Sequence, residues 1–167
     1  GEMLLLADQD RSTWDRELIA RGLDHLLASA RGTDLSGYHI EAEIASIHAT
    51  ANSIETTDWH RIVECYDLLQ TRNYSPIAEL NRIIAIGRIN GPAAALEMLE
   101  ALANDGKLDS YYLFYAAKAH FLAAVGQIAK ATADYSTAGS LSHNETARQL
   151  IASKMADLMK LNSKRTF

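Results

Sequence analysis

Two glycine turns that lie 35 residues apart, at Gly91-Pro92 and at Gly126, restrict the fold of this chain more than any other feature. A helical pattern of small and apolar residues follows each turn, with repeats three or four positions apart. A period of about 34 residues is typical of helical-hairpin repeats, in which each unit buries its apolar face by stacking on its neighbours. The recurrence therefore predicts a row of antiparallel helix pairs.

Composition agrees with a helical fold. The 167 residues include only two prolines and nine glycines, and 48% of them are hydrophobic, which is ordinary for a folded domain. We expect about eight helices and no strand, with three hairpins between a leading and a closing helix that cap the stack. The first helices of the hairpins are expected to begin near Tyr38, Pro76 and Tyr111, and their partners near Asp58, Pro92 and Gln127.

Capping and turn residues set the expected boundaries. Ser12 and Asp15 form a capping-box pattern that predicts the start of the leading helix, and Gly32 predicts its end. The segment 38–51 alternates in part like a strand, but its Ala and Glu residues and its helical spacing favour a helix. Asn144 is expected to cap the last helix.

The sequence predicts a single folded domain. We assign 1–11 to a leading segment, 12–162 to an all-α, tetratricopeptide-like right-handed solenoid, and 163–167 to a tail. Gly91 and Gly126 are expected to adopt positive φ angles in the turns between paired helices, because glycine has no Cβ atom to clash there.

Charge and hydropathy limit where the chain acts. The net charge is −5, whereas domains that grip a nucleic-acid backbone are usually basic, so we expect no direct nucleic-acid contact. Met3–Ala7 is too short for the apolar part of a signal peptide, and no run approaches a membrane span, so we expect a cytoplasmic protein without membrane contact. Gly1-Glu2 does not resemble a natural start, so we expect the chain to belong to a longer protein.

The residue pattern offers no catalytic, cofactor or metal site. Cys65 lies in an apolar helical pattern and is expected to be a small core residue. The six histidines lack the i, i+4 spacing of a helical zinc site, and Gly87 and Gly91 lack the lysine and the preceding strand of a phosphate loop. We therefore predict a chain that is not an enzyme, with a helical enzyme as the least favoured class.

Several sequence strings are similar to a known family. They are LLADQDRS followed by WDR at residues 4–16, TDW at 57–59, SP with LNR at 75–82, and GPAA at 91–94. Together they resemble the C-terminal tetratricopeptide-like extension of a subfamily of bacterial extracytoplasmic-function sigma factors. The resemblance runs from about Leu4 to about Leu158, nearly the whole chain.

The resemblance implies a role in transcription initiation. In that family the promoter-reading and polymerase-binding domains precede the extension, and no residues here match them. The extension is expected to regulate or support the sigma factor through contacts with the sigma core domains, with RNA polymerase or with a regulatory protein. The alternative is a stand-alone adaptor that binds peptides.

The polar cluster Asp8, Asp10 and Arg11 precedes the first predicted helix and is a candidate for protein binding. One interpretation is a docking element that joins this domain to the sigma domains. The other is a solvated turn with an Arg–Asp pair, since turns collect such residues.

Asn81 and Arg82 interrupt an apolar helix and, together with Asp58, are the second candidate for protein binding. They either face a groove and bind a peptide or carboxylate, or form a buried network that fixes helix register, with Asp58 or Glu79 as the partner of Arg82. Among the aromatic residues, Tyr38 and Tyr74 are the candidates for exposed contact. The others are expected in the core: Trp59, Tyr66, Tyr111, Tyr112 and Tyr115.

Overall fold

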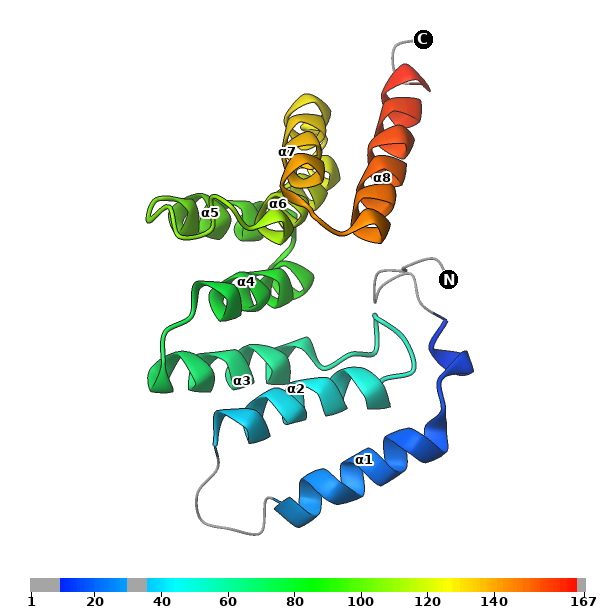
Figure 1. Cartoon of the computed structure of the whole chain (residues 1–167), viewed down its shortest axis with the longest axis vertical. Coiled ribbons are helices and arrows are strands. Elements are labelled where there is room, and N and C mark those ends of the chain that lie inside the picture. The colour runs from blue at the N-terminus through cyan, green and yellow to red at the C-terminus, as the bar shows by residue number, and fades with distance from the viewer. Residues whose placement is uncertain (1–9, 30–35, 165–167) are drawn as a thin grey trace. The chain divides into compact units, whose positions relative to one another are not determined.

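The computed structural model describes residues 10–29 and 36–164, and every regular element in these ranges is helical. This confirms the predicted all-α class. The described residues form a 3-10 helix and eight α-helices in the order η1 (Arg11–Thr13), α1 (Arg16–Ser29), α2 (Gly37–Thr50), α3 (Trp59–Arg72), α4 (Pro76–Asn90), α5 (Pro92–Ala103), α6 (Tyr112–Ala124), α7 (Ile128–Leu141) and α8 (Glu145–Lys164). The α-helices are labelled in Figure 1.

The predicted start of the leading helix at Ser12 is wrong. The Asp10 carboxylate accepts hydrogen bonds from the Ser12 N–H (2.9 Å) and hydroxyl (2.6 Å), and this local bonding winds residues 11–13 into a 3-10 turn. Asp15, rather than Ser12, caps α1, because its Oδ1 accepts a hydrogen bond from the Leu18 N–H at 2.9 Å. The predicted end of this helix at Gly32 lies outside the described residues.

The other boundaries are close to the predicted ones. Residues 37–50 are helical, which settles the choice between strand and helix for this segment. Asp58 caps α3 by accepting from the Arg61 N–H at 3.0 Å, and Asn144 caps α8 by accepting from the Ala147 N–H at 3.1 Å. Pro76 opens α4, where its missing N–H leaves no hydrogen bond unmade.

The chain forms two compact units, with the division inside α4 after Ala85. We call residues 10–29 and 36–85 the N-terminal unit, and residues 86–164 the C-terminal unit. None of the described helices combines the length and the apolar character that a bilayer crossing requires.

The core of the N-terminal unit joins α2, α3 and α4. Its buried members are Ile40, Ile44, Ile62, Cys65 and Ala85. Cys65 is thus the core residue that the sequence predicted. Helix α1 packs against α2, and none of its own residues is fully buried.

In the C-terminal unit α6 packs against both α5 and α7, and α7 packs against α8. Small residues allow this close approach: Ala119 on α6 and Ala131 and Ala138 on α7 are completely buried. Packing on two sides explains why α6 is apolar nearly all round.

The two glycine turns have the predicted backbone conformation. Gly91 has φ +89° and Gly126 has φ +82°, both in the region that only glycine adopts freely, and each leads directly into a new helix. Gly87 serves a different purpose inside α4. A Cβ atom there would lie 2.6 Å from the Phe121 ring and 3.0 Å from the Ala95 Cβ, so its lack of a side chain lets α5 and α6 approach.

We predict that Gly87→Ala destabilises the protein by about 1–3 kcal/mol, because the new methyl group overpacks a buried ring that is only 4% exposed. Gly22→Ala is the matched control. Gly22 is also helical but has no atom within 4 Å of the position of an added Cβ. Gly22→Ala is therefore expected to raise the free energy of unfolding by about 0.5–1 kcal/mol. Urea unfolding followed by circular dichroism measures both, and equal effects of the two substitutions would contradict the packing at Gly87.

Candidate protein-interaction site

Arg11 is buried, although it lies in a short polar turn at the start of the described chain. Only 3% of the Arg11 surface is exposed. Its Nη1 lies within hydrogen-bond distance of four oxygens: the carbonyls of His48 (3.1 Å), Ala51 (3.2 Å) and Ser53 (3.1 Å), and the Thr57 hydroxyl (3.1 Å). Nη1 carries two hydrogens, so the four oxygens share them.

These oxygens explain why an arginine stands here. The last carbonyls of a helix have no partner within the helix, and α2 ends at Thr50. Arg11 binds this end of α2, and Arg16 adds to it through the Ala49 carbonyl at 3.5 Å. A guanidinium suits the site because it offers several donors and its positive charge complements the negative end of the helix dipole.

Two tryptophans enclose the buried arginine and its neighbour. The Trp14 ring centroid lies 5.4 Å from the Arg11 Cζ, within cation–π range. The Trp59 ring packs edge-on against the His48 ring at 5.4 Å, and its Nε1 donates to the Ile54 carbonyl at 3.0 Å. We call Arg11, Trp14, His48, Thr57 and Trp59 the Arg11 node.

The Arg11 node changes the interpretation of the first candidate cluster. Arg11 does not pair with Asp10: Arg11 binds the end of α2, and the Asp10 carboxylate binds Ser12, which lowers the pKa of Asp10. Asp10 is exposed and can meet a partner, whereas the Arg11 side chain cannot do so without leaving its site. Asp8 lies outside the described residues.

The second candidate, Arg82, is bound to two carboxylates. Its Nε donates to Asp67 on α3, and its Nη1 donates to Glu79 at 3.3 Å. Glu79 was one of the two expected partners, while Asp58 instead caps α3. Asp67 was missed because it meets Arg82 only once the register between α3 and α4 is known.

The network continues into the turn before α4. Gln70 donates to Glu79 and to the Ser75 carbonyl, both at 3.1 Å, and accepts from the Ser75 N–H at 3.0 Å. Leu80, one residue before the Asn81-Arg82 pair, is 1% exposed and fills the core. The string from Ser75 to Arg82 therefore encodes the turn, the buried face and the ion pairs of one helix junction.

Helices α2 and α4 each carry exposed residues outside this network. Tyr38 is 83% exposed and Ile77 is 44% exposed, while Glu41 and Asn81 are also exposed. Residues at i, i+3 and i, i+4 share a helix face, so Tyr38 lies with Glu41 and Ile77 lies with Asn81. We call these four residues the α2–α4 face.

Tyr66 of α3 connects the two halves of the α2–α4 face. Burial and the charge of Glu41 raise the pKa of its hydroxyl, and a hydrogen bond with the Asn81 side chain opposes that rise. Glu41 and Asn81 are therefore both neighbours of the same phenol. Tyr38 and Asn81 were predicted from the sequence, whereas Glu41 and Ile77 were not, although their helical spacing was a signal for both.

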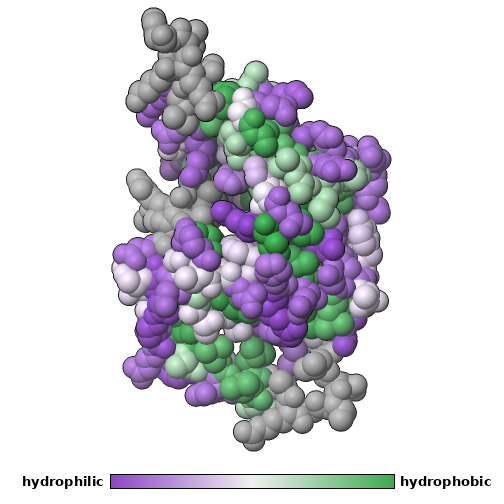
Figure 2. Space-filling view, turned by 180° about the vertical axis from the view of Figure 1, so that it is seen from behind, coloured by the Kyte–Doolittle hydropathy of each residue, from purple (hydrophilic) through white to green (hydrophobic). Residues whose placement is uncertain are grey.

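In the view of Figure 2, green hydrophobic areas alternate with hydrophilic ones. Tyr74, the remaining aromatic candidate, is 52% exposed in the turn between α3 and α4. The predicted core aromatics Trp59 and Tyr66 pack on the N-terminal core, and Tyr112 and Tyr115 pack on the core between α6, α7 and α8.

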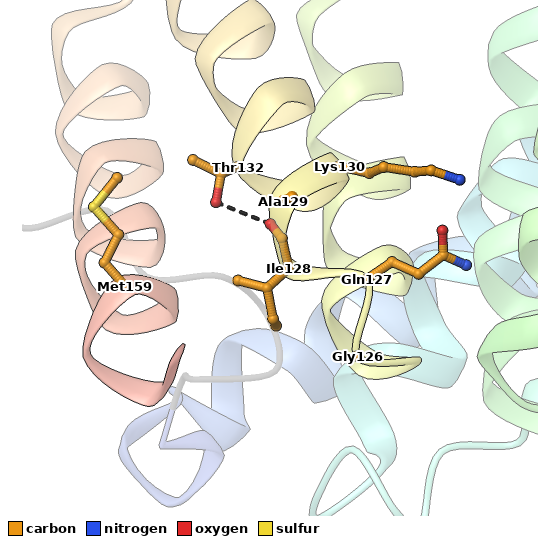
Figure 3. Close-up of a pocket in the computed structure, with 7 residues that line it drawn as sticks. All are labelled: Gly126, Gln127, Ile128, Ala129, Lys130, Thr132 and Met159. Atoms are coloured by element: carbon orange, nitrogen blue, oxygen red, sulfur yellow. Dashed lines mark hydrogen bonds between the residues drawn. The ribbon is translucent and has the colours of Figure 1, made fainter. Parts of the chain in front are cut away.

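A hollow of about 610 Å³ lies at the start of α7. Its walls run from Gly126 to Thr132 with Met159 of α8 opposite. In Figure 3 the Lys130 and Gln127 side chains point away from Met159, and the Thr132 hydroxyl is bonded to the Ile128 carbonyl at 3.0 Å. The polar groups therefore do not converge on one point, as a small-molecule site requires.

Within the described ranges no three His, Cys, Asp or Glu side chains gather where they could hold a metal ion. Cys65 is buried, and burial raises the pKa of its thiol above the ordinary range, which makes the thiolate scarce near neutral pH.

The chain is 32% identical over 158 residues to a protein of Rhizobium meliloti (strain 1021) that is described as uncharacterized. The match covers 95% of this chain and 37% of that protein, so the chain spans little more than a third of the length of its curated relative. No protein-family model matches the chain, and no solved structure matches it significantly. A region similar to this chain thus occurs within a longer protein.

We predict that Arg11→Met lowers the free energy of unfolding of the N-terminal unit by about 2–4 kcal/mol, because it removes a buried donor from the partly buried carbonyls of His48 and Ala51 at the end of α2. Arg21→Met on the exposed side of α1 is the matched control, with an expected change of about 0.5 kcal/mol or less. Tryptophan fluorescence during urea unfolding is the readout. If Arg11→Met left the free energy of unfolding unchanged, the Arg11 node would not stabilise the N-terminal unit.

We predict a coupling free energy of about 0.5–1 kcal/mol between Arg82 and Asp67 in a double-mutant cycle with alanine, since the Arg82 side chain is only 23% exposed. The same cycle on the exposed pair Arg148 and Glu145 is expected to give less. Urea unfolding of the single and double variants measures both couplings, and a larger value for the exposed pair would contradict the assignment.

Proposed function

We propose that this chain is a protein-interaction module, the C-terminal regulatory extension of an extracytoplasmic-function sigma factor, built as a tetratricopeptide-like stack of helical hairpins. Three features support the stack: paired helices of similar length, small residues where α6 meets α7, and positive-φ glycines 35 residues apart. The family strings and the occurrence of a similar region within a longer protein support the sigma-factor part of the proposal.

The α2–α4 face is the observation that carries the interaction role. The Tyr38 ring is 83% exposed, and aromatic residues are enriched in protein interfaces and among the residues that contribute most to binding. In contrast, Arg82 is committed to Asp67 and Glu79. Contact with a partner is therefore assigned to Tyr38 and Asn81 rather than to Arg82.

Charge indicates the chemistry of the partner. Residues 4–85 contain thirteen acidic and seven basic side chains, whereas residues 86–167 contain seven acidic and nine basic ones. The excess of negative charge thus belongs to the half that carries the α2–α4 face. A basic protein surface, such as one on a sigma domain or on RNA polymerase, is the complementary partner, and electrostatic attraction of this kind weakens as salt rises.

The first test is the natural reading frame. The proposal requires sigma domains encoded before this sequence, and a natural protein without them would support the stand-alone adaptor instead. The second test is promoter-directed transcription in vitro with the complete natural protein and with a version that lacks residues 10–167. Equal transcription by the two would contradict a regulatory role for this region.

We predict that Tyr38→Ala together with Asn81→Ala weakens binding of this chain to the separately purified sigma domains or to RNA polymerase by about tenfold. This is the effect expected when the loss of interface contacts makes the binding free energy less favourable by about 1.4 kcal/mol. The matched control is Met159→Ala with Asn52→Ala, which changes one exposed apolar and one exposed polar residue elsewhere. Fluorescence anisotropy of the labelled chain measures the affinities, and equal losses for both pairs would show that the face is misplaced.

A further inference from the structure

His48 has an unusual position inside the Arg11 node. Its backbone carbonyl accepts from Arg11, and its ring packs against Trp59. The residue as a whole is half-buried, but its Nδ1 is fully enclosed and has no hydrogen-bond partner among the described residues. Arg11 Nη2 is in the same situation. An enclosed, unpartnered ring nitrogen suits a neutral imidazole and not a charged one.

The charges around His48 are positive in the described part of the chain. From η1, Arg11 faces it, and the oxygens that accept from Arg11 are carbonyls and a hydroxyl rather than carboxylates. From α1, Arg16 reaches the neighbouring Ala49 carbonyl. From α3 the contact is the uncharged Trp59 ring, while the Asp58 carboxylate beside it is exposed and engaged with the Arg61 N–H.

We propose that the Arg11 node is an acid-sensitive latch, in which protonation of His48 places a second cation beside the buried guanidinium and releases η1 from the end of α2. Release would uncover the last carbonyls of α2 and the loop from Ala51 to Thr57, and would free the chain before α1 from the helical body. The latch is independent of the identity of the partner proposed above.

The direction of the pH dependence follows from the two states of the latch. Burial, and then the charge of Arg11, lower the pKa of His48 below its ordinary value of 6.5 in the closed state. The open state, with a solvated ring, takes up a proton near pH 6.5 and so binds more protons than the closed state below that value. The closed latch is therefore fully stable above about pH 6.5 and loses stability as the pH falls below it. The negative end of α2 favours the charged ring and opposes this loss, but the net shift is downward.

The protein carries its own reporters for the test. Its only two tryptophans, Trp14 and Trp59, both belong to the Arg11 node, so tryptophan fluorescence reports on the latch, while circular dichroism separates its opening from unfolding of the unit. Opening is expected to shift the emission to longer wavelength between pH 7.5 and pH 5, while circular dichroism keeps most of its helical signal. Hydrogen exchange of amides in residues 51–57, corrected for intrinsic rates, is expected to rise by up to about tenfold per pH unit below 6.5, the limit for one coupled proton.

Two variants decide the role of His48. His48→Gln removes the titrating ring and is expected to abolish the fluorescence shift and the extra exchange, whereas His25→Gln, at an exposed histidine of α1, is expected to keep both. Identical pH responses in His48→Gln and the unmodified chain would overturn the latch, and so would a flat response of the unmodified chain down to pH 5.

A second measurement covers the case in which His48→Gln does not fold. In the unmodified chain the imidazole resonances of the six histidines can be titrated by NMR. The latch requires the His48 resonance to titrate with a midpoint below 6.5 and together with the tryptophan emission. Titration of His48 at an ordinary value, or separately from the tryptophans, would overturn it.

Discussion

The N-terminal unit depends on a single buried charge. Arg11 brings together the 3-10 turn that contains it, the end of α2, the loop that follows, and Thr57 just before α3. A helix end buried without donors is unfavourable, and here the donors come from a segment 37 to 46 residues away in sequence. This interaction fixes where α1 begins. The chain must first place Arg11 at the end of α2, and only after Trp14 and Asp15 can it enter the helix.

The rest of the architecture relies on the absence of side-chain bulk where helices meet. Gly87 admits Phe121, and Ala119 on α6 packs near Ala138 on α7. Polar residues then fix the register along the helix pairs, as Arg82 does between α3 and α4. The surface available to a partner then includes exposed side chains such as Tyr38.

Much of the fold could be predicted because local rules dominate it. Proline at the start of α4 and α5, aspartate and asparagine caps, and glycines with positive φ each depend on a few neighbouring residues. The start of α1 could not be predicted from the capping-box pattern, because Asp10 competes for Ser12. Nor could the burial of Arg11, since nothing local shows that a charged residue will meet the end of a helix far along the chain.

The same distinction applies to the candidate site. Tyr38 and Tyr74 were expected to be exposed from their place near loops, and both are. The partner of Arg82 on α3 and the neighbours of Tyr66 depend on the register between helices, which the sequence alone does not define. The interaction role proposed for the α2–α4 face therefore rests on tertiary geometry, whereas the link to sigma factors rests on sequence strings.

The burial of Arg11 is tested most directly by NMR of the arginine side chains at neutral pH. The account predicts that the guanidinium protons of Arg11 exchange slowly with water and that rotation of its Nη groups is blocked, in contrast to the exposed Arg21. Contacts from these protons to Trp14 and Thr57 are expected as well. An Arg11 guanidinium that exchanges and rotates as freely as that of Arg21 would contradict the account.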